Sequence, residues 1–379
     1  MFRAWRRLIG VAALGVALMI SLPAAAQAAE AHMRVIDVGT GLCVVARTPA
    51  GQVMVYDTGP RGTRCLEGIR HVIPSRASRR AAAPDDPQSR PVIDLLVLSH
   101  SDLDHIGGAA RILRDYQVLH VLHPGDDRPL GAASNRTMLG EARDAIAASG
   151  AEDWSLADVE MSFGDPIDLG AATATFIAGW HDGSLIIGED EASLPEGERN
   201  NGLSIVIRYE YGGHSVLLTG DTVGRLDGAA KRACDYAEQR MVERAQADDA
   251  DERVPIQSDV LIGQHHGGDD ASSMCFIAEV RPTYVVLSAG HHDGYVHPRA
   301  SAARRVLDAL NETPEHDIQP ENILRTDHRD NQGRPEWIFD ALRGCVDDWG
   351  DDDVDIFMPE GEPIRVEYRY AGRRCDARQ

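Results

Sequence analysis

The chain lacks several features that define common protein classes. None of its six cysteines lies in a Cys-x-x-Cys pair, so neither a zinc ribbon nor a thioredoxin-like redox site is supported. The apolar run at residues 8–22 is shorter than the roughly 20 residues that span a bilayer. No internal repeat is visible. These absences leave a globular chain of 379 residues with 43% hydrophobic content, long enough for one large core or two modest ones.

Basic side chains are scarce relative to acidic ones. The chain has 38 Lys and Arg against 60 Asp and Glu, a formal net charge of −22. A field of this sign repels polyanions at long range and attracts metal cations. A long nucleic acid is therefore disfavoured as a partner, and we expect a small-molecule or nucleotide-sized substrate.

The first 28 residues have the composition of a secretory signal. Arg3, Arg6 and Arg7 precede the apolar run, and Ala-Ala-Ala-Gln-Ala follows at residues 24–28. We expect cleavage there, which leaves an exported, periplasmic or secreted protein without a stable membrane anchor. An uncleaved anchor is the alternative, and the Arg6-Arg7 pair is also compatible with a twin-arginine signal.

The six cysteines all lie beyond this signal. An even number in an exported chain permits disulfides, and Cys345 with Cys375 could staple the C-terminal segment, although the sequence does not fix the pairing. Cys43 sits in an apolar run and is predicted to be a buried thiol.

Short apolar runs alternate with segments of helical spacing. A strand, a helix and a second strand between residues 92 and 122 form an α/β unit. Helical spacing also appears at residues 106–116, 137–149 and 298–311. The predicted strands are 34–37, 43–47, 53–57, 92–98, 118–122, 172–178, 203–211, 215–218, 260–262, 284–287 and 364–370.

Three segments interrupt this alternation. Residues 61–91 are predicted to be a surface loop, and residues 225–257 a solvated helix with an acidic loop. From about residue 340 the pattern loosens around the acidic stretch 351–355. We therefore predict one main domain over residues 29–340 and a C-terminal extension over 341–379.

The densest group of chemically useful residues follows the strand at 92–98. His100, Asp102, Asp104 and His105 lie within six residues, just before Gly107-Gly108. A tight loop between a strand and a helix can turn four such side chains toward one point, and glycines let the helix begin close to it. Helix caps and surface polar groups are the alternative interpretation.

Three further segments place potential ligands next to strands or helices. Asp221 follows the strand 215–218, His265 and His266 follow the strand 260–262, and His297 precedes Pro298 at the start of a helix. A strand that ends in Gly-Asp is common and weak evidence by itself. Repeated delivery of His and Asp at strand ends indicates a single site at one edge of a sheet.

These residues resemble the metallo-β-lactamase superfamily. Its HxHxDH motif is matched by His100, Asp102, Asp104 and His105, with Asp102 in place of the second histidine. That replacement is similar to the soluble domain of the ComEC family of competence proteins, and the likeness runs in order from about residue 33 to about residue 335. Further matches are the segments 37–42, 57–60, 200–201, 217–221, 265–267 and 297–298.

The sequence also departs from that family. Thr40 and Leu42 stand where the family has Gln and Asp, so a substrate or metal role at these positions is in doubt. The histidine of the superfamily's third motif has no clear counterpart, and His181, in the same interval, is interpreted as an ordinary surface histidine. The membrane channel that accompanies the ComEC domain is absent, so DNA uptake is not implied.

The resemblance implies the αββα sandwich of the superfamily, two mixed β-sheets flanked by helices. It also implies two adjacent divalent ions, Zn or Mn, bridged by a hydroxide. His100 and Asp102 would hold one ion, Asp104 and either His265 or His266 the other, with His105 beside them and Asp221 bridging. Because an oxygen ligand replaces a nitrogen ligand at Asp102, Mn²⁺ is as plausible as Zn²⁺.

The implied activity is hydrolysis of a phosphodiester or a related ester by metal-activated water. Asp104 is expected to be essential for turnover. His297 is a candidate general acid or oxyanion contact, or simply a residue at the start of a helix. The same metal pair supports lactone, thioester or β-lactam hydrolysis, and a non-catalytic binding scaffold is the third alternative.

Overall fold

Two β-sheets pack face to face in the computed structural model, which describes residues 28–73, 90–125, 133–180, 194–226, 228–290, 297–313, 318–327 and 352–369. The first sheet has eight strands in the order β15-β14-β1-β2-β3-β4-β5-β6. Its strands are β1 Glu30–Val35, β2 Val44–Arg47, β3 Val53–Tyr56, β4 Val92–Val97, β5 Gln117–His123, β6 Glu152–Ser155, β14 Val354–Pro359 and β15 Arg365–Tyr368.

The second sheet has seven strands in the order β13-β12-β11-β10-β9-β8-β7. They are β7 Pro166–Leu169, β8 Ala172–Ala178, β9 Val206–Tyr211, β10 His214–Leu218, β11 Val260–Ile262, β12 Tyr284–Leu287 and β13 Ile323–Arg325. Both sheets are mixed: β3 to β6 and β10 to β13 run parallel, and the other neighbouring strands pair antiparallel.

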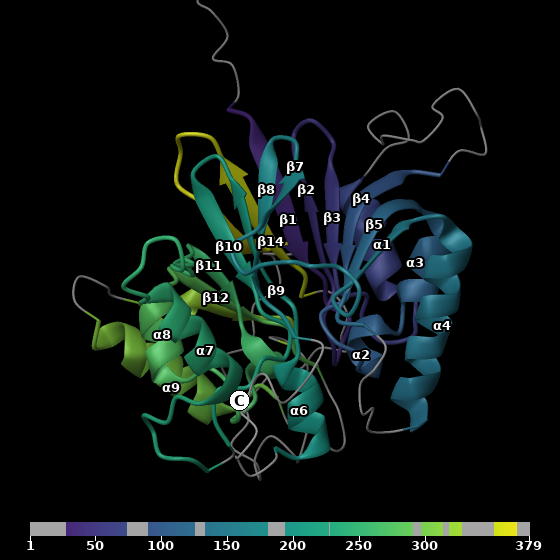
Figure 1. The fold of residues 1–379 in the computed structure, drawn as a ribbon. Coiled ribbons are helices and arrows are strands. Elements are labelled where there is room, and N and C mark those ends of the chain that lie inside the picture. Colours follow the sequence, from purple (N-terminus) through teal and green to yellow (C-terminus); the bar gives the residue numbers. More distant parts are fainter. Residues whose placement is uncertain are drawn as a thin grey trace, which may run out of the picture.

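Helices cover the outer face of each sheet (Figure 1). The first sheet is covered by α1 Arg64–Val72, α3 Ala109–Asp115 and α4 Ala133–Ser149, and the second by α7 Tyr236–Ala245, α8 Met274–Val280 and α9 Ala300–Asn311. The short helices are α2 Leu103–Ile106, α6 Glu196–Gly202, η1 Gln264–Gly267 and η2 Pro320–Asn322. The predicted αββα sandwich is therefore confirmed.

The alternation of side chains along each strand explains the layers. In β3, Met54 and Tyr56 belong to the core between the sheets, whereas Val53 and Val55 pack under the helices. Successive side chains of a strand point to opposite faces, so a strand buried on both sides has an unbroken apolar sequence.

Within the described residues, every helix is too short or too polar to span a membrane.

The predicted surface loop at residues 61–91 is partly wrong. Residues 64–72 form α1, whose buried face includes Leu66, Ile69 and Val72 at helical spacing. Its arginine-rich surroundings hid that spacing in the sequence. Residues 74–89 lie outside the described part of the chain.

The prediction that Cys43 is a buried thiol is wrong. Cys43 is bonded to Cys65, which ties the start of β2 to α1. A second disulfide joins Cys234, ahead of α7, to Cys275 in α8. The suggested partners Cys345 and Cys375 lie outside the described residues.

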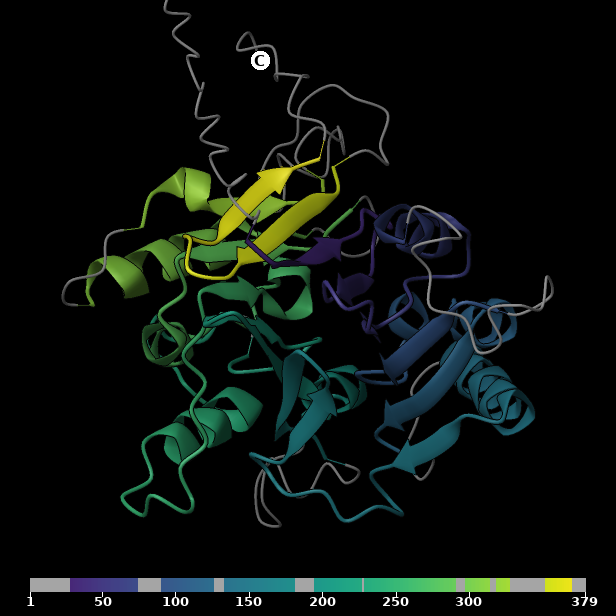
Figure 2. The ribbon, with the colours of Figure 1, turned by 90° about the horizontal axis from the view of Figure 1, so that it is seen from above.

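Residues near the C-terminus complete the first sheet. β14 pairs antiparallel with β1, and β15 pairs with β14; in Figure 2 both lie beside β1. The sequence indicated only the second of them, because acidic residues run into β14. Asp355 is balanced there by Arg34, whose Nε and Nη2 donate to its two oxygens at 2.7 and 2.8 Å. The division of the chain near residue 340 stays a prediction.

Candidate metal centre

The candidate ligands meet where parallel strands of both sheets end. His100 follows β4 in the first sheet; in the second, Asp221 follows β10 and His266 follows β11. The short helices α2 and α6 lie at this end of the sandwich (Figure 1). Loops at the ends of parallel strands are held by a rigid sheet, and this lets them present side chains precisely.

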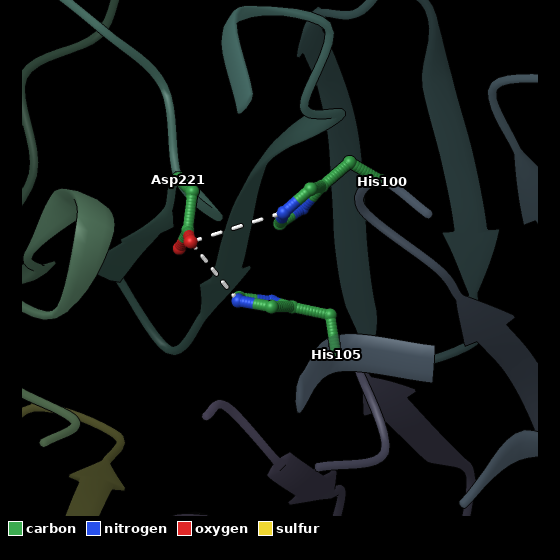
Figure 3. A group of neighbouring side chains, drawn as sticks. All are labelled: His100, His105 and Asp221. Atoms are coloured by element: carbon green, nitrogen blue, oxygen red, sulfur yellow. Dashed lines mark ion pairs between the residues drawn. The ribbon is translucent and has the colours of Figure 1, made fainter. Parts of the chain in front are cut away.

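His100, His105 and Asp221 form the first group, shown in Figure 3. The Oδ2 atom of Asp221 lies 3.1 Å from His105 Nε2 and 3.8 Å from His100 Nε2. All three side chains are buried. Asp102 adjoins this group, because its Oδ2 lies 3.7 Å from His100 Nε2.

Asp104, His105 and His266 form a second group that shares His105 with the first. His266 Nε2 lies 3.4 Å from Asp104 Oδ2, 3.4 Å from Asp221 Oδ2 and 3.2 Å from His105 Nε2. The Asp221 carboxylate of the first group thus also lies against His266 of the second. Six residues predicted from three separate segments converge on this cluster: His100, Asp102, Asp104, His105, Asp221 and His266.

His265 contacts Asp270 and Asn201, whereas His266 contacts the clustered carboxylates. Its Nδ1 lies 2.8 Å from both oxygens of Asp270, and its Nε2 lies 3.3 Å from the Asn201 amide. Adjacent residues separate in this way because His265 and His266 both have positive φ, 44° and 53°. Such backbone is costly for residues other than glycine and is concentrated at functional sites.

His297 lies beside the cluster rather than in it. Its ring centroid is 5.1 Å from that of His265 and 6.5 Å from that of His266. Burial and the two neighbouring histidines lower the pKa of His297 to about 3. The catalytic role assigned to His297 stays a prediction.

Second hydrogen bonds fix the rings of two clustered histidines. His105 Nδ1 lies 2.8 Å from Asp57 Oδ2, and His266 Nδ1 donates to the carbonyl of Ser288 at 2.7 Å. Each ring therefore presents Nε2 to the cluster. Asp57 also accepts from the Ser99 amide and hydroxyl, each at 2.7 Å, and is fully buried.

Sequence reasoning gave no role to Asp57 or Asp270. Asp57 follows β3 in an Asp-Thr-Gly segment, the same signature of a strand followed by a carboxylate that pointed to Asp221. That signal would have found it. Asp270 lies in a loop with no periodicity to mark it.

Ser204 and Gly220 pack closely against the first group. Ser204 Oγ lies 3.3 Å from His100 Nδ1 and accepts from the Asp221 amide at 3.1 Å. Gly220 has φ of 54°, and a Cβ there would lie 2.9 Å from atoms of Ser204 and Ser99. The glycine before Asp221 is therefore required by both conformation and space.

The charges of the cluster stabilise one another. Burial alone would raise the pKa of Asp221 and of Asp104, but the adjacent imidazoles, His105 above all, hold both pKa values well below the usual range. Burial would likewise lower the pKa of His266, yet Asp221 and Asp104 raise it to about 9. Opposite charges at this spacing favour the ionised forms.

Two buried atoms of the cluster have no hydrogen-bond partner among the described residues. They are His100 Nε2 and Asp221 Oδ1. Unpaired buried polar atoms are rare in folded proteins because each costs the free energy of its desolvation. Imidazole nitrogen and carboxylate oxygen are the donors that Zn²⁺ and Mn²⁺ accept, so this set of residues fits divalent cations.

Comparison with known proteins gives the family. The sequence profile of the metallo-beta-lactamase superfamily matches residues 36–291, which include every clustered side chain. The chain belongs to this superfamily. It is 26% identical over 236 residues to ComE operon protein 3 of Bacillus subtilis, 62% of this chain and 24% of that protein. It is 27% identical over 284 residues to Competence protein ComA of Neisseria gonorrhoeae, 75% of this chain and 30% of that protein.

The resemblance to competence proteins is thus confirmed, although this chain spans only about a quarter to a third of their length. Among solved structures, the metallo-beta-lactamase fold protein YhfI of Bacillus subtilis matches with a TM-score of 0.40 and 11% identity over 78% of this chain and 95% of that one. CmlA of Streptomyces venezuelae, a diiron beta-hydroxylase, matches with 0.41 and 14% over 78% and 53%.

The structure shows what Leu42 and Thr40, the two positions that differ from the competence family, contact. Leu42 is buried in the core between the sheets, and its amide donates to the carbonyl of Asp104 at 3.2 Å. Thr40 Oγ1 donates to the carbonyl of Gly290 at 3.2 Å. Position 42 therefore packs apolar surface and supports Asp104 through its backbone. His181 lies outside the described residues.

Proposed function

We propose that this chain is an exported hydrolase that uses two divalent cations, Zn²⁺ or Mn²⁺, to cleave a phosphodiester or a related ester. One observation carries the proposal. The Oδ2 atom of Asp221 lies within 3.8 Å of the Nε2 atoms of three buried histidines, His100, His105 and His266. Members of the superfamily are typically metal-dependent hydrolases.

His100 and Asp102 would hold one cation and Asp104 and His266 the other, with Asp221 between them and His105 adjoining both. When bound, such cations lower the pKa of water and stabilise charge that develops on a substrate oxygen. In this proposal His266 is the ligand and His265 supports it, since only His266 Nε2 faces Asp104 and Asp221.

The chain's own residues prepare this chemistry. Asp57 and the Ser288 carbonyl fix the rings of His105 and His266. Because ligands must be deprotonated, cation binding would replace the protons now shared between imidazoles and carboxylates. In this proposal His297, whose ring lies 5.1 Å from that of His265, contacts the substrate.

Resemblance to competence proteins favours the phosphodiester, and the net charge of −22 favours a small or nucleotide-sized substrate over a long nucleic acid. Export is supported by the two disulfides, Cys43–Cys65 and Cys234–Cys275, because disulfides persist in oxidising compartments.

The test is turnover by the purified protein with Mn²⁺ or Zn²⁺ against bis-p-nitrophenyl phosphate, a lactone, a thioester and a β-lactam. We expect metal-dependent cleavage of the phosphodiester, lost in Asp104→Ala and retained in Asp144→Ala, a change at an exposed position of α4. If only the lactone, the thioester or the β-lactam is cleaved, that compound defines the substrate class and the phosphodiester proposal is wrong. A protein that binds no cation would be a scaffold.

A further inference from the structure

Asp102 occupies a position where the superfamily motif has a histidine. A histidine presents one lone pair in the plane of a rigid ring, whereas a carboxylate has two equivalent oxygens and rotates freely about its last bond. An aspartate at this position therefore needs partners that fix which oxygen faces a cation.

Asn200, in α6, provides the first such partner. Its Nδ2 donates to Asp102 Oδ1, and its own Oδ1 accepts from the Ser101 hydroxyl at 3.0 Å. Asn200 is only 3% exposed. With Oδ1 engaged in this way, Oδ2 is the oxygen that faces His100 Nε2, 3.7 Å away.

Asn201 provides the second partner and links it to His265. In the amide orientation that satisfies its neighbours, the nitrogen donates to Asp102 Oδ2 and to the Gly197 carbonyl, each at 3.2 Å, and the oxygen accepts from His265 Nε2 at 3.3 Å. His265 is in turn held by Asp270 through Nδ1 at 2.8 Å. A continuous, partly buried network thus runs from Asp270 through His265 and Asn201 to Asp102.

We propose that Asn200 and Asn201 are positioning residues that aim the Asp102 carboxylate at the cation on the His100 side, and that His265 and Asp270 brace Asn201. This inference rests on the proposed function, because it takes Asp102 to be a ligand. It gives a role to α6, which carries both asparagines, and to His265, which contacts Asn201 and not the clustered carboxylates.

Calorimetric titration of the full chain with Mn²⁺ tests the proposal. Loss of a partner that orients a ligand typically weakens metal binding about 10- to 100-fold. We expect that loss at one of two sites in Asn200→Ala and Asn201→Ala, with the Asp104 and His266 side unchanged. Asn311→Ala, at the exposed end of α9, should bind both ions like the wild type.

A double-mutant cycle separates orientation of Asp102 from a general structural effect. In an Asp102→Ala background, Asn201→Ala should cause no further loss of affinity. An equal loss in both backgrounds, or unchanged binding by Asn201→Ala, would overturn the inference. Asn201→Asp keeps the side-chain size but cannot donate to Asp102, so it should also lose affinity even where the alanine variant folds poorly.

The outcomes for the two proposals differ. If the wild type binds two ions and cleaves the phosphodiester while Asn201→Ala does the same, only the positioning role is wrong. If the wild type binds no Mn²⁺ or Zn²⁺, the metal site and the positioning role are both overturned.

Discussion

Asp57 illustrates how much of the site depends on side chains that would touch no cation. It accepts two hydrogen bonds from Ser99 and one from His105 while fully buried. Its φ of 56° places it in a conformation unusual for a residue with a side chain. Strain of this kind is tolerated where surrounding contacts over-determine the conformation.

Asp57→Asn is predicted to weaken metal binding about 10- to 100-fold, the usual cost of losing a partner that orients a histidine ligand. Both oxygens of Asp57 accept hydrogen bonds in the wild type. An asparagine side chain has only one acceptor oxygen, so it cannot replace all of the bonds from Ser99 and His105. Mn²⁺ and Zn²⁺ titration measures the effect, with Asp158→Asn, at an exposed position, as the matched control. Wild-type affinity in Asp57→Asn would show that Asp57 does not set the His105 ring.

At the level of single residues, the sequence predicted the strand-end groups well. His100, Asp104 and Asp221 follow apolar runs, and their convergence follows from the geometry of parallel strands. It could not distinguish His265 from His266, because the choice depends on two consecutive left-handed residues. Nor could it reveal Asp270, whose importance comes entirely from a tertiary contact.

Two helices on the outer face of the second sheet hold the segment 269–273 that carries Asp270. Glu238 in α7 accepts from the Ser272 and Ser273 amides, each at 2.8 Å. Arg305 in α9 donates to the carbonyls of Asp269 and Ala271 at 3.0 and 2.8 Å. A buried carboxyl group and a buried guanidinium thus fix this segment from two sides.

Burial raises the pKa of Glu238 from 4.5 to about 7, against the opposing effect of its hydrogen bonds and of Arg305. The folded state therefore binds more protons than the unfolded state between these values, so stability should fall as the pH rises through this window. The contribution of Glu238 is at most about 3 kcal/mol at 1.36 kcal/mol per pKa unit.

Urea unfolding between pH 5 and 8 checks this sign. The free energy of unfolding of the wild type relative to Glu238→Gln should decrease toward pH 7 and then level off. Glu243→Gln, on the exposed face of α7, should show no such trend. A difference between wild type and Glu238→Gln that is constant or rises with pH would contradict the account.

At the level of elements, the sequence predicted strands wherever apolar runs were continuous. It missed strands such as β14, which contain charged residues and are buried by the strands that pair with them. β14 includes Asp355, yet Ile356 and Met358 on the same strand are fully buried against β1. The arginine that makes an acidic residue acceptable in this strand lies more than 300 positions away in the chain. In the same way, the arginines around α1 hid its helical spacing, and the sequence predicted a loop there.

For the molecule as a whole, the disulfide Cys43–Cys65 ties α1 to the first sheet. Replacing both Cys43 and Cys65 by alanine is predicted to lower the free energy of unfolding by about 2 to 4 kcal/mol, since the bond limits the unfolded chain. Urea unfolding measures this loss, and reductant should destabilise the wild type at least as much. A free thiol at Cys43 in oxidised protein, found by mass spectrometry, would contradict the assignment.

The fold class was predictable because the motif residues and the order of apolar runs agree with one superfamily. What that agreement leaves to experiment is whether the converged side chains bind two cations. Anomalous diffraction from crystals grown with Mn²⁺ or Zn²⁺ measures this most directly. The account predicts two peaks, one beside His100 and Asp221 and one beside Asp104 and His266. Diffraction with no peak in this cluster, or with peaks only elsewhere, would contradict it.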